Sequence, residues 1–128
     1  MFKERVPSDV VKAVFHYLGA GERFPAKIPK IHEAFFRLCQ REEFSGLCSE
    51  FVFDTSKIFP YSPTIRYALD RLQKADLLAC RNPALDEYEV SKALANAEAD
   101  VVELFPSERE RTLLKEAATL FRKYVSAA

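Results

Sequence analysis

Residues 51–90 read FVFDTSKIFPYSPTIRYALDRLQKADLLACRNPALDEYEV, and the order of elements in this stretch decides the predicted fold. Ser62-Pro63 is typical of a helix start, because a serine side chain can accept a hydrogen bond from a first-turn amide and the fixed φ of proline suits that turn. Small and apolar residues then recur at helical spacing: Ile65, Ala68, Leu69, Leu72 and Ala75. We therefore predict a helix over residues 62–75 with these side chains buried.

A strand is expected before this helix and a hairpin after it. Phe51–Phe53 is a short β candidate, and Asp54-Thr55-Ser56 has the side chains of a turn rather than those of a nucleophilic site. After the helix, two short runs at 77–81 and 87–90 flank the turn-forming residues 82–86. This spacing predicts an antiparallel hairpin.

Helical segments are predicted on both sides of this stretch. The first covers residues 8–18 and ends at Gly19 and Gly21, a loop covers 22–28, and a second helix runs from Pro29 to about Phe44. Ser91 can cap a fourth helix over 92–105, and Pro106-Ser107 separates it from a last helix over 108–128. We predict one mainly α (α+β) domain over 1–128, with a core at about 8–90, a small antiparallel sheet and two additional C-terminal helices at about 91–128.

Helix, helix, short strand, capped helix and hairpin is an order that resembles the winged helix-turn-helix superfamily. The residues that carry the resemblance are 51–53, the IxxALxxL spacing of 62–75, and 77–90. The resemblance implies that the third helix enters the major groove of double-stranded DNA and that the hairpin, or wing, contacts the flanking backbone. The implied DNA-binding residues are Thr64, Arg66, Tyr67, Arg71 and Lys74 on the helix and Arg81 at the base of the wing.

Two features depart from this DNA-binding pattern. Asp70 lies in the middle of the predicted reading face, where it would repel phosphate unless it neutralises a neighbour such as Arg66 or Lys74. Residues 82–89 contain acids but no Lys or Arg, so the wing tip would contact a phosphate backbone poorly. A second class of function therefore stays open: a protein-interaction module that uses the winged helix only as a scaffold.

The C-terminal helices allow two interpretations each. The last helix has a broad apolar stripe, which either packs into the core or pairs two chains as a homodimer; its members are Leu113, Leu114, Ala117, Leu120, Phe121, Tyr124 and Val125. The fourth helix carries Glu98, Asp100 and Glu103, which form either a solvated face or a surface for a basic partner.

Composition fits a compact domain and gives no strong sign of nucleic-acid binding. The chain has 128 residues, a hydrophobic fraction of 48%, eleven Phe and a net charge of zero. Basic residues exceed acidic ones before residue 82, whereas residues 82–110 are strongly acidic. The predicted reading helix thus lies in a mildly basic segment, which is compatible with DNA without requiring it.

No constellation of residues points to an enzyme, a metal site or a cofactor. His32-Glu33 begins like HExxH, but Phe36 replaces the second histidine, and His16 and His32 are expected at helix surfaces or edges. The three glycines argue against a phosphate-binding loop. Cys39, Cys48 and Cys80 lack metal-ligand spacing and are expected to be reduced, apolar residues of a cytoplasmic protein. No segment has the length of a membrane span or a signal peptide.

Overall fold

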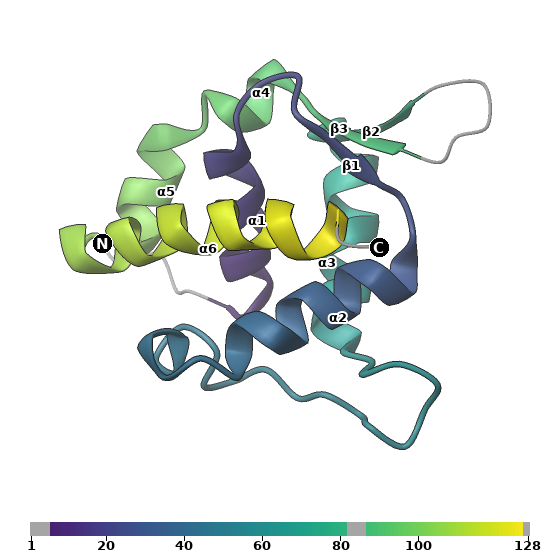
Figure 1. Ribbon diagram of the computed structural model, residues 1–128. Helices are drawn as coiled ribbons and strands as arrows, with labels where there is room; N and C mark the ends of the chain where they lie inside the picture. The colour runs from purple at the N-terminus through teal and green to yellow at the C-terminus, as the bar shows by residue number, and fades with distance from the viewer. Residues whose placement is uncertain (1–5, 82–86, 127–128) are drawn as a thin grey trace.

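The computed structural model describes residues 6–81 and 87–126, which form a helical domain with one small sheet (Figure 1). The helices are α1 (Ser8–Leu18), α2 (Ile28–Cys39), the 3-10 helix η1 (Glu42–Phe44), α3 (Pro63–Lys74), α4 (Lys92–Ala95), α5 (Glu98–Leu104) and α6 (Glu108–Ser126). The strands are β1 (Arg23–Pro25), β2 (Leu78–Arg81) and β3 (Glu87–Val90). The α+β class, the helix over 62–75 and the antiparallel pairing of the two strands after it are therefore confirmed.

The sheet has the order β1-β3-β2 and is antiparallel throughout. Its first strand, β1, lies within the predicted loop 22–28, where Phe24 pairs with Tyr88 and packs its ring 5.6 Å from the Tyr88 ring. Burying Phe24, which is 3% exposed, gives this three-residue strand its stability.

The prediction of a strand at Phe51–Phe53 is wrong, because these residues form no strand. This segment instead packs its rings on α2: Phe53 lies 5.2 Å from Phe36, and Phe51 lies 6.4 Å from Phe35. Only an isolated bridge forms nearby, between Asp54 and Tyr61. The sheet edge beside β3 is already occupied by β1, and the two aromatic residues are partly buried against a helix instead of in a ladder. The turn chemistry of Asp54 is confirmed, because its carboxylate accepts hydrogen bonds from the Ser56 amide and hydroxyl at 3.0 and 2.6 Å.

The second helix ends earlier than predicted, and a disulfide follows it. α2 stops at Cys39, the chain turns through η1, and Phe44 and Leu47 become buried beneath the turn. This turn brings the Cα atoms of Cys39 and Cys48 to 5.6 Å, and the two residues form a disulfide. The expectation of three reduced cysteines is therefore wrong for this pair, whereas Cys80 takes no part in the disulfide.

The predicted fourth helix is broken into α4 and α5 by His16 of α1. Ser91 caps α4 as expected, accepting a hydrogen bond from the Leu94 amide at 3.1 Å. The Leu94 carbonyl then accepts a hydrogen bond from His16 Nδ1 at 2.8 Å, and the Glu98 carboxylate lies 2.8 Å from His16 Nε2. Because a carbonyl and a carboxylate both accept, the ring donates to both only with a proton on each nitrogen. His16 is 6% exposed, so its predicted surface position is wrong.

The last helix packs one face on elements from the beginning of the chain. α6 packs against α1, α2 and β1, and its fully buried side chains are Leu114, Ala117, Ala118, Phe121 and Val125. The core-packing interpretation of the apolar stripe is therefore confirmed. Within the described ranges, no helix combines the length and apolarity that a membrane span requires.

The disulfide gives a prediction about stability. Cys39 and Cys48 are separated by nine positions, and a closed loop of this size removes enough chain entropy from the unfolded state to stabilise the fold by about 2–3 kcal/mol. We expect Cys39→Ser/Cys48→Ser to lower the free energy of unfolding by this amount in urea denaturation. Reductant should have the same effect on the wild-type chain and none on the double variant. Cys80→Ser is the control, and it should keep the full response to reductant; an equal stability of oxidised and reduced wild type would contradict the prediction.

Candidate nucleic-acid interface

Helix α3 is held to the domain by one face and leaves the opposite face uncovered. Its buried residues are Ile65, Ala68, Leu69 and Leu72, and it packs against α1 and β2. Ala75, predicted to be buried, is the exposed C-cap residue. The next residue, Asp76, has a φ of 59° and turns the chain into β2.

The start of α3 is built differently from the prediction. Ser62 occupies the N-cap position, but its hydroxyl makes no capping hydrogen bond and is buried without a partner. The Ser62 amide instead donates to Nδ1 of His32 at 2.9 Å. The start of α3 is therefore tied to α2 through a buried histidine.

The predicted DNA-binding residues on α3 share one surface. Arg66, Tyr67, Arg71 and Lys74 are exposed, and Thr64 is half-buried in the first turn. Asp70 is exposed among them. The side chain of Arg81, predicted at the base of the wing, lies outside the described part of the chain, as do the wing-tip residues 82–86.

Asp70 pairs with Arg66 one turn before it. The Arg66 Nε and an Asp70 carboxylate oxygen lie 3.9 Å apart, with both side chains 51% exposed. An exposed pair of this kind contributes little to stability. Its consequence is electrostatic: Asp70 is neutralised, and Arg71 and Lys74 give the surface its excess positive charge.

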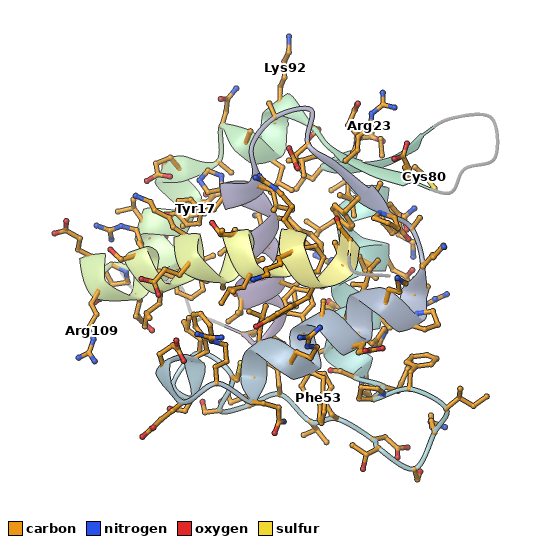
Figure 2. All side chains as sticks on the ribbon, in the orientation of Figure 1. Tyr17, Arg23, Phe53, Cys80, Lys92 and Arg109 are labelled. Carbon is orange, nitrogen blue, oxygen red and sulfur yellow. A yellow bond between two sulfur atoms is a disulfide. The ribbon has the colours of Figure 1, made fainter. Side chains whose placement is uncertain are left out.

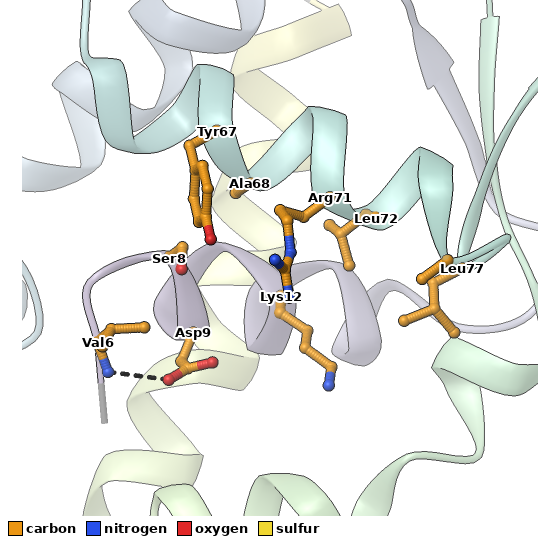
Figure 3. A pocket seen from close by; sticks show the side chains of 10 residues that line it. Val6, Ser8, Asp9, Lys12, Tyr67, Ala68, Arg71, Leu72 and Leu77 are labelled. Carbon is orange, nitrogen blue, oxygen red and sulfur yellow. Dashed lines mark hydrogen bonds between the residues drawn. The ribbon is translucent and has the colours of Figure 1, made fainter. Parts of the chain in front are cut away.

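Tyr67 and Arg71 lean from α3 toward α1 (Figure 3). The Arg71 guanidinium carbon lies 5.6 Å from the centre of the Tyr67 ring, within the range of a cation–π contact. These two side chains line a cavity of about 270 Å³ between the helices, together with residues of α1 such as Asp9 and Lys12. The sequence predicted which face of α3 is uncovered, but not that two of its residues border a groove.

The acids on β3 are balanced by a residue that the sequence interpretation overlooked. Arg23 projects from β1 beside the hairpin (Figure 2), with its Nε 3.0 Å from Glu89 and its Nη1 3.8 Å from Glu87. Arg23 lies in the segment predicted to be a loop, and no local pattern connects it with the hairpin. The described base of the β2–β3 hairpin is consequently less acidic than its own sequence implies.

His32 also differs from the prediction, because it is buried and does not lie at a helix surface or edge. It is fully buried, its ring stacks on Tyr61 with centroids 4.9 Å apart, and its Nδ1 accepts the Ser62 amide hydrogen bond. Burial in this aromatic pocket, and to a smaller extent the charge of Arg66, lower the pKa of His32 from 6.5 to about 4. The neutral ring supports the start of α3, and protonation would remove the lone pair that accepts from Ser62.

The lowered pKa of His32 predicts acid destabilisation. Its folded pKa of about 4 lies below the unfolded value of 6.5, so its stabilising contribution is complete above pH 6.5 and is lost as the pH falls toward 4. The full shift corresponds to a loss of on the order of 3 kcal/mol. We expect His32→Asn, whose Oδ1 can accept the same amide hydrogen bond without titrating, to be less sensitive to acid. Thermal melts of both proteins between pH 7 and 4 measure the difference, and parallel curves would show that His32 does not carry the effect.

Neither a metal centre nor a known relative adds to this description. Among residues 6–81 and 87–126, no three His, Cys, Asp or Glu side chains gather closely enough to hold a metal ion. Comparison with protein-family models, with curated proteins and with solved structures gave no match.

Proposed function

We propose that this chain is a winged-helix domain that binds double-stranded DNA in regulation, with α3 as the helix that enters the major groove. The observation that carries the proposal is the uncovered face of α3, on which Arg66, Tyr67, Arg71 and Lys74 are all exposed. Arginine and lysine suit phosphate oxygens and guanine edges, and tyrosine suits phosphates.

The order of elements around α3 also supports the proposal. α3 leads directly into the β2–β3 hairpin, and β1 pairs with β3, so that the helix and the hairpin share one rigid frame. One feature departs from a simple helix-turn-helix: residues 40–62, including η1, connect α2 to α3, whereas the motif uses a turn of a few residues. The proposal therefore rests on α3 and the hairpin, not on the α2–α3 turn.

The strength of DNA binding is limited by charge. The chain has a net charge of zero, and on α3 the carboxylate of Asp70 offsets one of three cations. A few phosphate contacts are expected, and each contributes to a linear fall of log affinity with log salt concentration. Binding should be measurable at low salt and should weaken steeply as salt is added.

Charge reversal on α3 tests this proposal. Arg71→Glu with Lys74→Glu replaces two exposed cations by anions, and we expect it to abolish binding to mixed-sequence duplex DNA at low salt. Fluorescence anisotropy across a salt series measures the affinity and the salt slope of each protein. The folded state of each variant is checked by its thermal melt.

Arg109→Glu with Lys123→Glu is the matched control, because it makes the same change in net charge at two exposed positions on α6. This control should lose only the small, non-local part of the affinity. If the α3 variant kept its DNA affinity, or if both variants lost it equally, α3 would not be the reading helix. If the wild-type chain did not bind at low salt, the DNA proposal itself would fail.

A homodimer would place two α3 helices on one face of a two-fold DNA site. The apolar stripe of α6 is already buried in the core of its own chain, so pairing would require another surface. Sedimentation equilibrium at micromolar concentrations tests this part of the proposal. A mass of 14.6 kDa at all concentrations would identify a monomer and remove the homodimer.

The alternative function is a protein-interaction module, and one surface feature favours it. In the segment between η1 and α3, Ile58 is fully exposed and Val52 is 70% exposed, although apolar side chains of this size are usually buried. Mutations distinguish the two functions. Val52→Ser with Ile58→Ser should weaken a protein complex and leave DNA binding unchanged. Charge reversal on α3 should abolish DNA binding and leave the protein complex unchanged.

A further inference from the structure

The cavity between α1 and α3 brings a cation beside apolar side chains. Its volume is about 270 Å³, and its apolar lining includes Ala68 and Leu72 of α3 and Leu77, which precedes β2. Arg71 reaches into the space between the two helices from above (Figure 3). A guanidinium beside apolar side chains favours a ligand that has both a negative charge and a hydrocarbon part.

The donors of Arg71 are free to bind such a ligand. Among the residues that the structure describes, its guanidinium has no hydrogen-bond acceptor and no carboxylate partner, and it lies over the ring of Tyr67. A guanidinium presents five N–H donors in a planar arrangement that matches the two oxygens of a carboxylate. Arg71 therefore has the geometry and the unused donors for bidentate binding of a carboxylate.

A second cation lines the same cavity from α1. Lys12 directs its ammonium to Asp100 on α5, but the two charged atoms are 3.7 Å apart and the carboxylate is 48% exposed. An ion pair of this kind is weak, so Lys12 can turn to an anion in the groove at little cost. Asp9 also borders the cavity, and its carboxylate accepts the amide hydrogen bond of Val6 at 2.9 Å.

We infer that the α1–α3 groove is a binding site for a small organic carboxylate, whose charged end is held by Arg71 and Lys12 and whose hydrocarbon part lies on Leu72 and Leu77. Asp9 selects against ligands with a second negative charge, because it stands at the same cavity. The site therefore favours monocarboxylates with an aliphatic or aromatic body over inorganic phosphate.

The groove shares Tyr67 and Arg71 with the proposed DNA-reading surface. A ligand carboxylate bound to Arg71 neutralises the charge of the guanidinium and holds the side chain between α1 and α3, so the ligand should lower DNA affinity. This consequence rests on the proposed function, whereas ligand binding itself does not. The two can fail separately, because the ligand titration contains no DNA and the salt series contains no ligand.

The test uses hexanoate as the probe in an NMR titration of the full chain. We expect saturable shifts of the Leu72 and Leu77 signals with hexanoate, and a much weaker response to hexylamine, which has the same body and the opposite charge. Inorganic phosphate, which has charge without a body, should also bind more weakly. Equal binding of either comparison compound would overturn the assignment, as would the absence of saturable shifts at about 10 mM hexanoate.

Two variants locate the site. Lys12→Gln with Arg71→Gln should weaken hexanoate binding at least about tenfold, because it removes both charge-assisted contacts. Lys12→Gln alone should give an intermediate loss with α3 intact. Arg109→Gln with Lys123→Gln removes two cations from α6, and it should leave the affinity for hexanoate unchanged. Equal losses in the groove variant and the α6 variant would show binding by net charge alone and would overturn the proposal.

Discussion

The side chain of Phe121 on the last helix is the contact on which the other elements depend. Its ring lies 5.4 Å from Phe15 of α1, 5.2 Å from Phe24 of β1 and 5.1 Å from Phe35 of α2, and all four rings are buried. Aromatic rings at these separations add favourable edge and offset contacts to a large burial of apolar area. Helix α6, at the end of the chain, therefore holds together α1, α2 and β1 from the beginning of the chain.

This arrangement determines how α3 is presented. Phe24 links the aromatic cluster to the sheet, because its ring also contacts Tyr88 on β3. The sheet in turn continues from α3 through Asp76 and β2. α3 is thus held at its C-terminal end by the sheet, along one face by α1, and at its start by His32 of α2. Three attachments on one side leave the opposite side of the helix uncovered, and the candidate interface is a consequence of that geometry.

Two buried histidines connect the elements through polar contacts within this apolar frame. His16 joins α1 to both parts of the broken helix, through the Leu94 carbonyl and the Glu98 carboxylate. His32 joins α2 to the amide of Ser62, and its low pKa keeps the ring neutral at ordinary pH. Each of these buried hydrogen bonds is made only when its two elements are correctly placed, so it favours one arrangement of the helices over alternatives of similar hydrophobic burial.

The sequence by itself determined the features that depend on local periodicity: the helix over 62–75 with its buried and exposed faces, the paired strands that follow it, the Ser91 cap and the turn at Asp54. Each of these follows from neighbouring residues, because helical and β spacings repeat within a few positions. Only the tertiary structure decided the strand at Arg23–Pro25, the break between Ala95 and Glu98, the burial of His16 and His32, and the disulfide between Cys39 and Cys48. These features depend on partners that are distant in sequence or that meet only after a turn: Tyr88 for Phe24, His16 for Leu94, and the turn through η1 for the two cysteines.

The candidate site follows the same division. The periodicity of α3 indicated which of its residues are exposed. The groove that Arg71 shares with Lys12 exists only where two separate helices meet, so the sequence pattern of one helix could not predict it.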